Sequence, residues 1–329
     1  MIVALTGASG FLGHQTLLRL LKNPAISAIR ASGRNFRPEQ QVKDPRVHYI
    51  IGDLTTNTVV EALLQGATHV VHAAALSSVW GAYADFEKAN VQATQLLIDA
   101  SKREGIERFV FVSSPAMYFD FSDKLNVSET DPLPEPLINA YAKTKREAEL
   151  RLQQSGLSYV IVRPRAIIGV GDSVIMPRLI RAYDEGKLKI IGKGRNVVDF
   201  SSVQNVAQAI ELSLLAKPEQ ANEIYHISNG EEVNLWEAIS SILVQLGRKA
   251  PTQKIPFWLA FRFAQLLEWK ARFFQQNEPA LTTYAVGVLS KSYTLDIRHA
   301  KEKLGFIPEV STEQAMNEFV EWWLKEERN

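Results

Sequence analysis

The segment Thr6-Gly7-Ala8-Ser9-Gly10-Phe11-Leu12-Gly13 follows a short apolar run, Ile2–Leu5, and opens a helical pattern over Gly10–Leu21. Glycines at the spacing G-x-x-G-x-x-G allow a tight turn, a close approach of backbone to a pyrophosphate, and tight helix–strand contact. The N–H groups and positive end of the helix can then receive phosphate charge. A strand before the turn and a helix after it favour a dinucleotide-binding turn over a glycine-rich turn without a ligand.

Short apolar runs alternate with helical patterns through the first half of the chain. The expected strands are Ile2–Leu5, Ile26–Ala31, Val47–Ile51, Thr68–Val71, Phe109–Val112 and Ser158–Val162. Helical patterns lie between them, notably at Val59–Leu64, Phe86–Arg103 and Asn139–Gln154. Strands that alternate with helices predict right-handed βαβ units. The expected fold class is therefore α/β, with a doubly wound parallel sheet of the Rossmann type.

The pattern changes near residue 165, where prolines and glycines become frequent. We expect residues 1–165 to form the dinucleotide-binding domain and residues 166–329 to form mainly a smaller substrate-binding lobe. A helical pattern at Gln204–Leu215 and a short strand at Ile224–Ile227 predict that elements near 197–230 return to the sheet. The C-terminal lobe is thus expected to be partly interleaved with the first domain.

Composition excludes several classes of function. The 37 Lys+Arg and 36 Asp+Glu give a formal net charge of +1, which argues against a nucleic-acid partner. The chain has no cysteine, so thiolate catalysis and cysteine-based metal sites are excluded, and its six histidines show no ligand spacing. We therefore expect no metal. Without a signal-peptide pattern or an uncharged span of about 20 apolar residues, a cytoplasmic protein without a transmembrane span is expected.

The residues that follow the second expected strand bear on the choice of dinucleotide. An NAD site usually carries Asp or Glu about 20 residues past the glycines, where it holds the ribose hydroxyls. Here that position falls on Ser32-Gly33-Arg34-Asn35, and no carboxylate lies between Gly13 and Glu39. Arg34, with Arg30 and Arg37 close by, could meet a 2′-phosphate instead. The sequence predicts a preference for NADP(H), with NAD(H) also allowed; a solvated surface role for Arg34 is the alternative.

Asp53 and Leu54 follow the third expected strand in the run Gly52-Asp53-Leu54. A carboxylate at the carboxyl end of a strand in this fold can face the adenine amino group across the crevice. It can equally cap the next helix, because Thr55 and Thr56 follow it. Both interpretations remain open at this point.

Tyr141 and Lys145 lie four residues apart in the helical pattern before the sixth strand, so they share one helical face. A phenol is a weak acid with an ordinary pKa near 10, and a nearby ammonium favours its ionised form. Such a pair is suited to moving a proton to or from an alcohol near neutral pH. Most Y-x-x-x-K pairs are surface neighbours, so this pair needs support from elsewhere in the chain.

Ser113 and Ser114 supply that support, because they end the strand Phe109–Val112 at the edge where open α/β sheets bind ligands. A serine there could hold a substrate oxygen against Tyr141. Taken alone, either serine is more often a turn or cap residue. Together with the glycine turn and the Y-x-x-x-K pair, it forms a specific combination.

With these residues, the chain resembles the extended short-chain dehydrogenases/reductases, of the NAD-dependent epimerase/dehydratase superfamily, over nearly its whole length. The matching runs are T-G-A-S-G-F-L-G at 6–13, G-D-L at 52–54, V-H-A-A-A at 71–75, N-V-Q-A-T-Q-L-L at 90–97, F-V-S-S at 111–114, Y-A-K-T-K at 141–145 and V-R-P at 162–164.

The resemblance implies a role for particular residues. Tyr141 is implied as the acid/base, and Lys145 as the group that lowers its pKa and binds the ribose. The four-residue step to Tyr118 aligns the catalytic serine with Ser114 rather than Ser113. Asn90 is a weaker fourth member, and a helix-capping role for it remains open. The cofactor-binding residues so implied are Gly7, Ser9, Gly10, Phe11, Leu12, Gly13, Arg34, Asp53, Leu54, Ala73, Ala74, Asn90, Tyr141, Lys145 and Pro164.

Two branches of this family compete. Nucleotide-sugar epimerases and dehydratases typically carry R-D-F or R-D-Y before V-x-D in the second half, but here Val198 and Asn205 occupy the positions of the arginine and the second aspartate. The runs at 163–172, 191–200, 279–290 and 295–308 resemble instead the 3β-hydroxysteroid dehydrogenase and 2-alkyl-3-ketoalkanoate reductase group. Arg165 and Arg178 could meet a substrate carboxylate, with surface solvation as an equal alternative.

The aromatic stretch Phe257–Phe274 is predicted to be helical and has no strictly polar face. It could line an apolar pocket, rest on a membrane surface as a peripheral contact, or pack within the lobe or in a homodimer.

We therefore expect an NADP(H)-preferring oxidoreductase that acts on a secondary alcohol or ketone of a hydrophobic substrate, of the sterol or 2-alkyl-3-keto acid type. A nucleotide-sugar epimerase or dehydratase is one alternative, and a non-catalytic dinucleotide-sensing regulator is the other.

Overall fold

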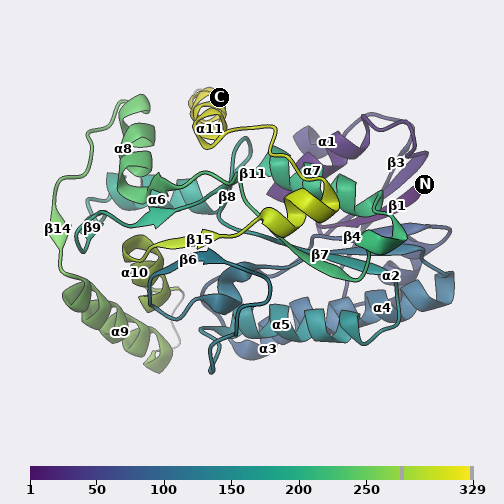
Figure 1. The fold of residues 1–329 in the computed structure, drawn as a ribbon, viewed down its shortest axis with the longest axis horizontal. Helices are drawn as coiled ribbons and strands as arrows, with labels where there is room; N and C mark the ends of the chain where they lie inside the picture. The colour runs from purple at the N-terminus through teal and green to yellow at the C-terminus, as the bar shows by residue number, and fades with distance from the viewer. Residues whose placement is uncertain (275–277, 327–329) are drawn as a thin grey trace.

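The computed structural model describes residues 1–274 and 278–326, and a seven-stranded sheet runs through it (Figure 1). Its strands are β1 (Ile2–Thr6), β2 (Ala28–Gly33), β3 (Val47–Ile51), β4 (His69–His72), β5 (Arg108–Val112), β7 (Tyr159–Pro164) and β12 (Glu223–Ile227). Their order is β12-β7-β5-β4-β1-β2-β3, and every neighbouring pair is parallel. The predicted doubly wound α/β fold is confirmed.

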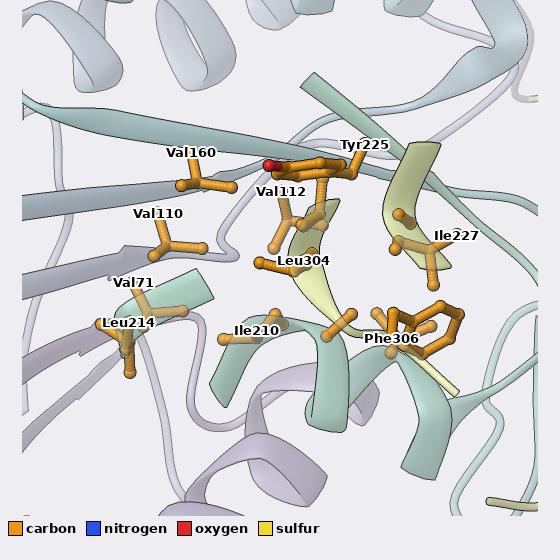
Figure 2. Packing of buried hydrophobic residues seen from close by; sticks show 14 of the residues in the cluster. Val71, Val110, Val112, Val160, Ile210, Leu214, Tyr225, Ile227, Leu304 and Phe306 are labelled. Atoms are coloured by element: carbon orange, nitrogen blue, oxygen red, sulfur yellow. The ribbon is translucent and has the colours of Figure 1, made fainter. Parts of the chain in front are cut away.

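Helices cover both faces of this sheet (Figure 1). One face carries α1 (Phe11–Leu20) and α7 (Val203–Leu214), and the other carries α2 (Asn57–Leu64), α4 (Ala93–Glu104) and α5 (Ala140–Gln153). The central strands are almost entirely buried, as expected where both faces are covered. Figure 2 shows one of the two resulting core layers, in which Val71, Val110 and Val160 of the sheet face Ile210 and Leu214 of α7.

The second expected strand differs most from its predicted bounds, lying at Ala28–Gly33 rather than Ile26–Ala31. Ile26 is a buried apolar residue that precedes the strand. The apolar pattern in the sequence therefore begins earlier than the pairing of β2 with β1. Between β4 and β5, the predicted helix Phe86–Arg103 is a continuous run of α3 (Tyr83–Phe86), a π-helical segment Glu87–Gln92, and α4.

The second half builds a separate core at the carboxyl end of the sheet, on the side opposite the N-terminus in Figure 1. Its helices are α6 (Ile175–Asp184), α8 (Leu235–Gln245), α9 (Phe257–Phe273), α10 (Thr283–Ser290) and α11 (Thr312–Glu326). A small sheet of order β13-β10-β15-β6 joins Val233–Asn234, Val197–Val198, Tyr293–Leu295 and Lys124–Val127. These strands have two to four residues, which is too short for a sequence periodicity to show.

Two parts of the second half pack on the first. Strand β12 and helix α7 join the large sheet, within the 197–230 region expected to return to it. Residues of the later segment 293–306 do so as well, because Leu304 and Phe306 lie in the same core layer as Ile210 (Figure 2). The sequence did not predict this second return.

Candidate active site

The order in which strands join the sheet reverses between β1 and β4, because β2 and β3 extend the sheet on one side of β1 and β4 and β5 extend it on the other. Open α/β sheets bind ligands outside the carboxyl ends of the strands at such a point. Gly7 follows β1 there, with φ of +71°, and Ala73 and Ala74 follow β4. A Cβ on Gly7 would lie 2.9 Å from the nitrogen of Ala74, so no other residue fits without a backbone shift.

The glycine turn has the features that a pyrophosphate requires. A Cβ on Gly13 would lie 2.0 Å from the carbonyl oxygen of Gly7, so the helix can approach the strand only with glycine there. Gly10 is the N-cap of α1 and supplies no side-chain cap, and no carboxylate lies in the first turn, which begins with Phe11 and Leu12. The N–H groups at this helix end are therefore available to an anion, and the residues present fit a dinucleotide.

Two other segments close around the turn. The carbonyl of Ser9 accepts a hydrogen bond from Gln40 Nε2 at 2.8 Å, which folds the loop after β2 over it. From the second half, the carbonyl of Val170 accepts from Gln15 Nε2 at 3.3 Å, and a Cβ on Gly171 would lie 3.5 Å from the Phe11 ring. The cofactor region is thus bordered by both halves of the chain.

The arginines near the end of β2 differ in their availability. Arg30 lies within β2, and its guanidinium donates to the carbonyls of Leu63 and Ala62 at the end of α2. Arg30 is therefore engaged away from the carboxyl edge, contrary to its expected place beside a 2′-phosphate. Arg34 is exposed directly after the strand, and its charge contributes to lowering the pKa of Asp53. Arg34 and Asp53 therefore lie on the same edge.

The Asp53 side chain stabilises the turn that follows it in the chain. Its Oδ1 accepts from the backbone N–H and the hydroxyl of Thr55, both at 2.9 Å, and these bonds are the main reason that its pKa is lowered. The carboxylate is exposed and Leu54 beside it is half-buried. The turn role is thus present, and contact with an adenine stays a prediction.

Asn90 is 2% exposed in the π-helical segment, and its side chain is satisfied within the protein. Oδ1 accepts from the N–H of Leu76 at 2.7 Å, while Nδ2 donates to the Leu76 carbonyl and to Thr144 Oγ1, both at 3.1 Å. Asn90 therefore ties the loop after β4 to α5. Its proposed contact with the cofactor stays a prediction.

Tyr141 and Ser114 are brought together from different elements. Tyr141 lies in the first turn of α5, which Asn139 caps by accepting from the N–H of Ala142 at 2.8 Å. Ser114 follows β5 and caps the short helix after it by accepting from the N–H of Ala116 at 3.2 Å, and its hydroxyl lies beside the Tyr141 phenol. Burial raises the pKa of Tyr141 to about 12, although the neighbouring Ser114 hydroxyl opposes the shift. The phenol is therefore protonated at neutral pH.

Ser113, one residue earlier, points away from this pair. Its side chain is 3% exposed, and its Oγ has no hydrogen-bond partner among the described residues. Successive side chains at the end of a strand face opposite sides. The structure therefore places Ser114, and not Ser113, beside Tyr141.

Lys145 is one turn after Tyr141 on α5 and is 1% exposed. Its Nζ donates to the carbonyl oxygen of Val112 at 2.6 Å and lies 4.0 Å from the centre of the Phe111 ring. Burial lowers the pKa of Lys145 to about 7, and the charge of Glu149 opposes that shift. Such strongly shifted groups gather at functional sites.

A buried ion pair holds α5 against the sheet. Glu149, one further turn along α5, accepts from Arg163 Nε at 2.8 Å and from Nη2 at 2.6 Å. Arg163 also donates to the Tyr118 hydroxyl at 2.6 Å, and its pKa is raised chiefly by Glu149, against burial. Pro164 then ends β7 as a buried residue. These contacts fix the face of α5 that carries Tyr141 and Lys145.

Aromatic side chains form the other wall of the site, and the sequence had not singled them out. Tyr284 of α10 lies close enough to Tyr141 that its charge would raise the pKa of that phenol, and its ring lies 5.9 Å from Phe119. Phe119 in turn neighbours Phe121, which contacts Phe261 of α9 at 5.2 Å between ring centres. Only the position of α10 reveals this wall.

Gly287 explains how α10 can approach these rings. A Cβ there would lie 2.7 Å from Phe121 and 2.9 Å from Phe119. A glycine inside the helical run 279–290 is a signal of close packing, but it does not identify Phe119 and Phe121 as the partners.

The two arginines considered for a substrate carboxylate are both paired. Arg165 is 8% exposed and donates to the Asp199 carbonyl at 2.6 Å, with its guanidinium 4.6 Å from the Tyr293 ring centre. The alternative of surface solvation is therefore wrong for Arg165. Arg178 is half-exposed and forms a two-point ion pair with Glu278 at 3.1 and 3.2 Å.

Val198 and Asn205, which depart from the sugar-nucleotide pattern, are buried structural residues. Val198 lies in the second core. Asn205 Oδ1 accepts from the N–H groups of Glu309 and Val310, while its Nδ2 donates to Asn229 Oδ1 and to the Val310 carbonyl. An aspartate could accept the first two bonds but could not donate the others.

In the described parts of the chain, 1–274 and 278–326, no helix has the length and apolar character to cross a bilayer. The same residues contain no cluster of three His, Asp or Glu side chains arranged for a metal ion.

The chain is similar to several known proteins over most of its length. The chain is 34% identical over 298 residues to the 3beta-hydroxysteroid-dehydrogenase/decarboxylase isoform 1 of Arabidopsis thaliana, covering 86% of this chain and 68% of that protein. It is 32% identical to the 2-alkyl-3-oxoalkanoate reductase of Stenotrophomonas maltophilia, covering 96% of this chain and 97% of that protein. The crystal structure of DesIV, a dTDP-glucose 4,6-dehydratase from Streptomyces venezuelae with NAD and TYD bound, shares the fold, with a TM-score of 0.78 and 24% identity over 99% of this chain and 97% of that one.

The model of the NAD dependent epimerase/dehydratase family matches residues 3–228, a span that includes the glycine turn, Ser114, Tyr141 and Lys145. This chain therefore belongs to the NAD dependent epimerase/dehydratase family, as the sequence resemblance predicted.

Proposed function

We propose that this protein is an NADP(H)-preferring oxidoreductase that interconverts a ketone and a secondary alcohol on a hydrophobic substrate of the 2-alkyl-3-keto acid or sterol type. The observation that carries the proposal is that the Tyr141 phenol lies beside the Ser114 hydroxyl, one helical turn from the buried Lys145 and next to the Tyr284–Phe119 wall. An acid beside a hydroxyl donor and an apolar wall suits an uncharged carbonyl group on an apolar body.

In the proposed reduction, Ser114 donates a hydrogen bond to the substrate carbonyl oxygen and Tyr141 gives that oxygen its proton. The raised pKa of Tyr141 keeps this proton in place at neutral pH, so the site starts in the acid form that reduction requires. Gly7, Gly10 and Gly13 would hold the nicotinamide cofactor, which would supply a hydride for the carbonyl carbon, so that the product would be the secondary alcohol. Lys145 is proposed to bind the ribose and to stabilise the phenolate left on Tyr141.

Both substrate types stay in the proposal, because relatives named for sterols and relatives named for 2-alkyl-3-oxoalkanoates each match most of this chain. Arg165 and Arg178 are both paired with carboxylates of the protein, so neither is proposed to bind a substrate carboxylate. Against a nucleotide-sugar substrate, this chain has no arginine at position 198 and therefore lacks a strong contact to a diphosphate.

The test is an assay of NADPH and NADH oxidation by the whole chain with 2-alkyl-3-keto acids and 3-keto sterols. Conversion of UDP-glucose, which consumes no NAD(P)H, is followed by chromatography of the sugar nucleotide. We expect turnover with a hydrophobic ketone, faster with NADPH. Tyr141→Phe should lower kcat at least about 100-fold and leave the affinity for NADPH unchanged. Turnover of the sugar nucleotide alone would support an epimerase or dehydratase instead. NADPH binding without turnover of any ketone would support a sensor.

A further inference from the structure

Helix α9 exposes large apolar side chains on the side that faces away from the protein. We call this side the outer face of α9, and it comprises Trp258, Phe263, Leu266, Trp269, Phe273 and the adjoining Phe274, each 52–68% exposed. Exposed apolar residues scattered singly need no explanation, but a contiguous group marks a site of interaction. These six lie within seventeen residues of one helix and its end.

The inner side of the same helix is lined by small residues. Ala260, Ala264 and Ala271 are the buried residues of α9, and Phe257 and Phe261 pack beside them. A helix on the surface of a water-soluble protein turns its large apolar side chains inward and its polar ones outward. Here the arrangement is reversed, so the packing of the protein does not account for the tryptophans and phenylalanines outside.

The charged side chains of α9 also differ by sign in whether they face solvent or the protein. Arg262, Lys270 and Arg272 are exposed. The one carboxylate of Phe257–Phe273, Glu268, is turned toward α10, where its Oε1 accepts from the N–H and the hydroxyl of Thr283 at 2.7 and 2.9 Å. The solvent side of α9 is therefore positive, although the whole chain has a formal charge of only +1.

We propose that the outer face of α9 docks on the surface of an anionic lipid bilayer, with the helix lying flat and its aromatic side chains inserted among the headgroups. Large apolar residues flanked by Lys and Arg are the pattern of helices that lie in this interface. Anionic headgroups complement Arg262 and Lys270, the cations that this face presents and for which α9 offers no carboxylate. Arg272, although exposed, has its guanidinium 5.4 Å from the centre of the Trp80 ring. Figure 1 shows α9 at an outer corner of the molecule beside α10, where a flat surface can reach it.

A second copy of the chain fits this face less well. A twofold dimer through the outer face would bring Arg262 and Lys270 of one copy toward the same cations of the other. With Glu268 turned inward, α9 offers them no carboxylate, and such a contact would be repulsive. The bilayer satisfies both the apolar and the charged side chains.

The experiment uses the full chain and vesicles of phosphatidylcholine, with or without phosphatidylglycerol, in a flotation assay. We expect the protein to float with the anionic vesicles, to bind neutral ones much more weakly, and to be released as the salt concentration rises. Replacing Arg262→Gln together with Lys270→Gln should weaken binding to anionic vesicles about fivefold per cation removed. The pair Lys102→Gln and Arg103→Gln, exposed cations on α4, is the matched control and should have no such effect.

A second pair of variants tests the apolar contribution. Trp269→Glu with Phe273→Glu should abolish flotation while leaving the melting temperature unchanged, because both side chains are exposed. Val244→Glu with Ile307→Glu, at residues that are 57% and 71% exposed elsewhere, should float like the unchanged protein. Equal binding to neutral and anionic vesicles would overturn the proposal. A dimer detected by sedimentation velocity without lipid would also overturn the proposal, if Trp269→Glu with Phe273→Glu dissociated that dimer and Val244→Glu with Ile307→Glu did not.

Discussion

The Nζ atom of Lys145 lies 2.6 Å from the carbonyl oxygen of Val112, which is the last residue of β5. This bond ties helix α5 to the strand end that carries Ser114, and it therefore sets the helix position at which Tyr141 meets that serine. The ammonium group contacts one carbonyl and one aromatic face and is shielded from water. Burying this ammonium group lowers the stability of the folded protein whenever the group is charged.

Lys145→Met should make the protein more stable at low pH and inactive. The pKa of Lys145 is lowered from 10.5 to about 7, so below pH 7 the folded state carries the full cost of burying the charge. Between the two values the unfolded state binds more protons, and the stability of the unchanged protein rises with pH. The variant's advantage, several kcal/mol at pH 6, should therefore fade by pH 10, as measured by urea unfolding at a series of pH values. An identical pH dependence in the two proteins would show that Lys145 is solvated.

The two serines after β5 should respond differently to removal of the hydroxyl. Ser114→Ala should lower kcat about 100-fold, because the donor beside Tyr141 is lost. Ser113→Ala should leave kcat within about threefold, since its buried hydroxyl has no partner among the described residues and its removal costs no hydrogen bond. Steady-state kinetics on a ketone substrate compares the pair. A larger loss in Ser113→Ala would reverse the assignment.

Arg34→Ala should reduce the affinity for NADPH by about 10- to 100-fold, the worth of a charge-assisted hydrogen bond, and should change that for NADH little. The exposed position of Arg34 at the end of β2 motivates this expectation. Arg195→Ala, at an exposed arginine between β9 (Ile190–Ile191) and β10, serves as the control for a simple loss of charge. Fluorescence titration with NADPH and with NADH measures the two affinities in both variants and in the unchanged protein. If the unchanged protein bound NADH far more tightly than NADPH, the preference would be wrong.

Glu149→Gln should destabilise the protein by about 3–5 kcal/mol, because it leaves the buried guanidinium of Arg163 without its counter-charge. Glu147→Gln is a control on the same helix, where Glu147 pairs with Arg151 and both side chains are about a third exposed. That variant should lose at most about 1 kcal/mol. Chemical unfolding at neutral pH measures both. Equal losses would mean that burial does not distinguish the two pairs.

The features that were predictable from the sequence are those set by local backbone geometry. Gly7 and Gly13 revealed a tight strand–turn–helix because only glycine fits there, and the spacing of Tyr141 and Lys145 placed both on one helical face. Apolar runs marked every strand of the large sheet, most clearly the central strands, because strands buried on both faces are largely apolar. These signals lie within a few residues of one another.

The remaining features depend on residues that are distant in the chain. Ser114 and Ser113 are chemically identical; the step to Tyr118 favoured Ser114 by resemblance, and the packing of α5 against β5 supplies the physical reason. Arg30 and Arg34 differ only in what lies beside each, and Tyr284 reaches the site because Gly287 lets α10 approach Phe119 and Phe121. For α9, the sequence showed an aromatic helix without showing which side would be covered. The side chain that a helix or strand presents to solvent is determined by the element that packs against it, and that contact exists only once the whole chain has folded.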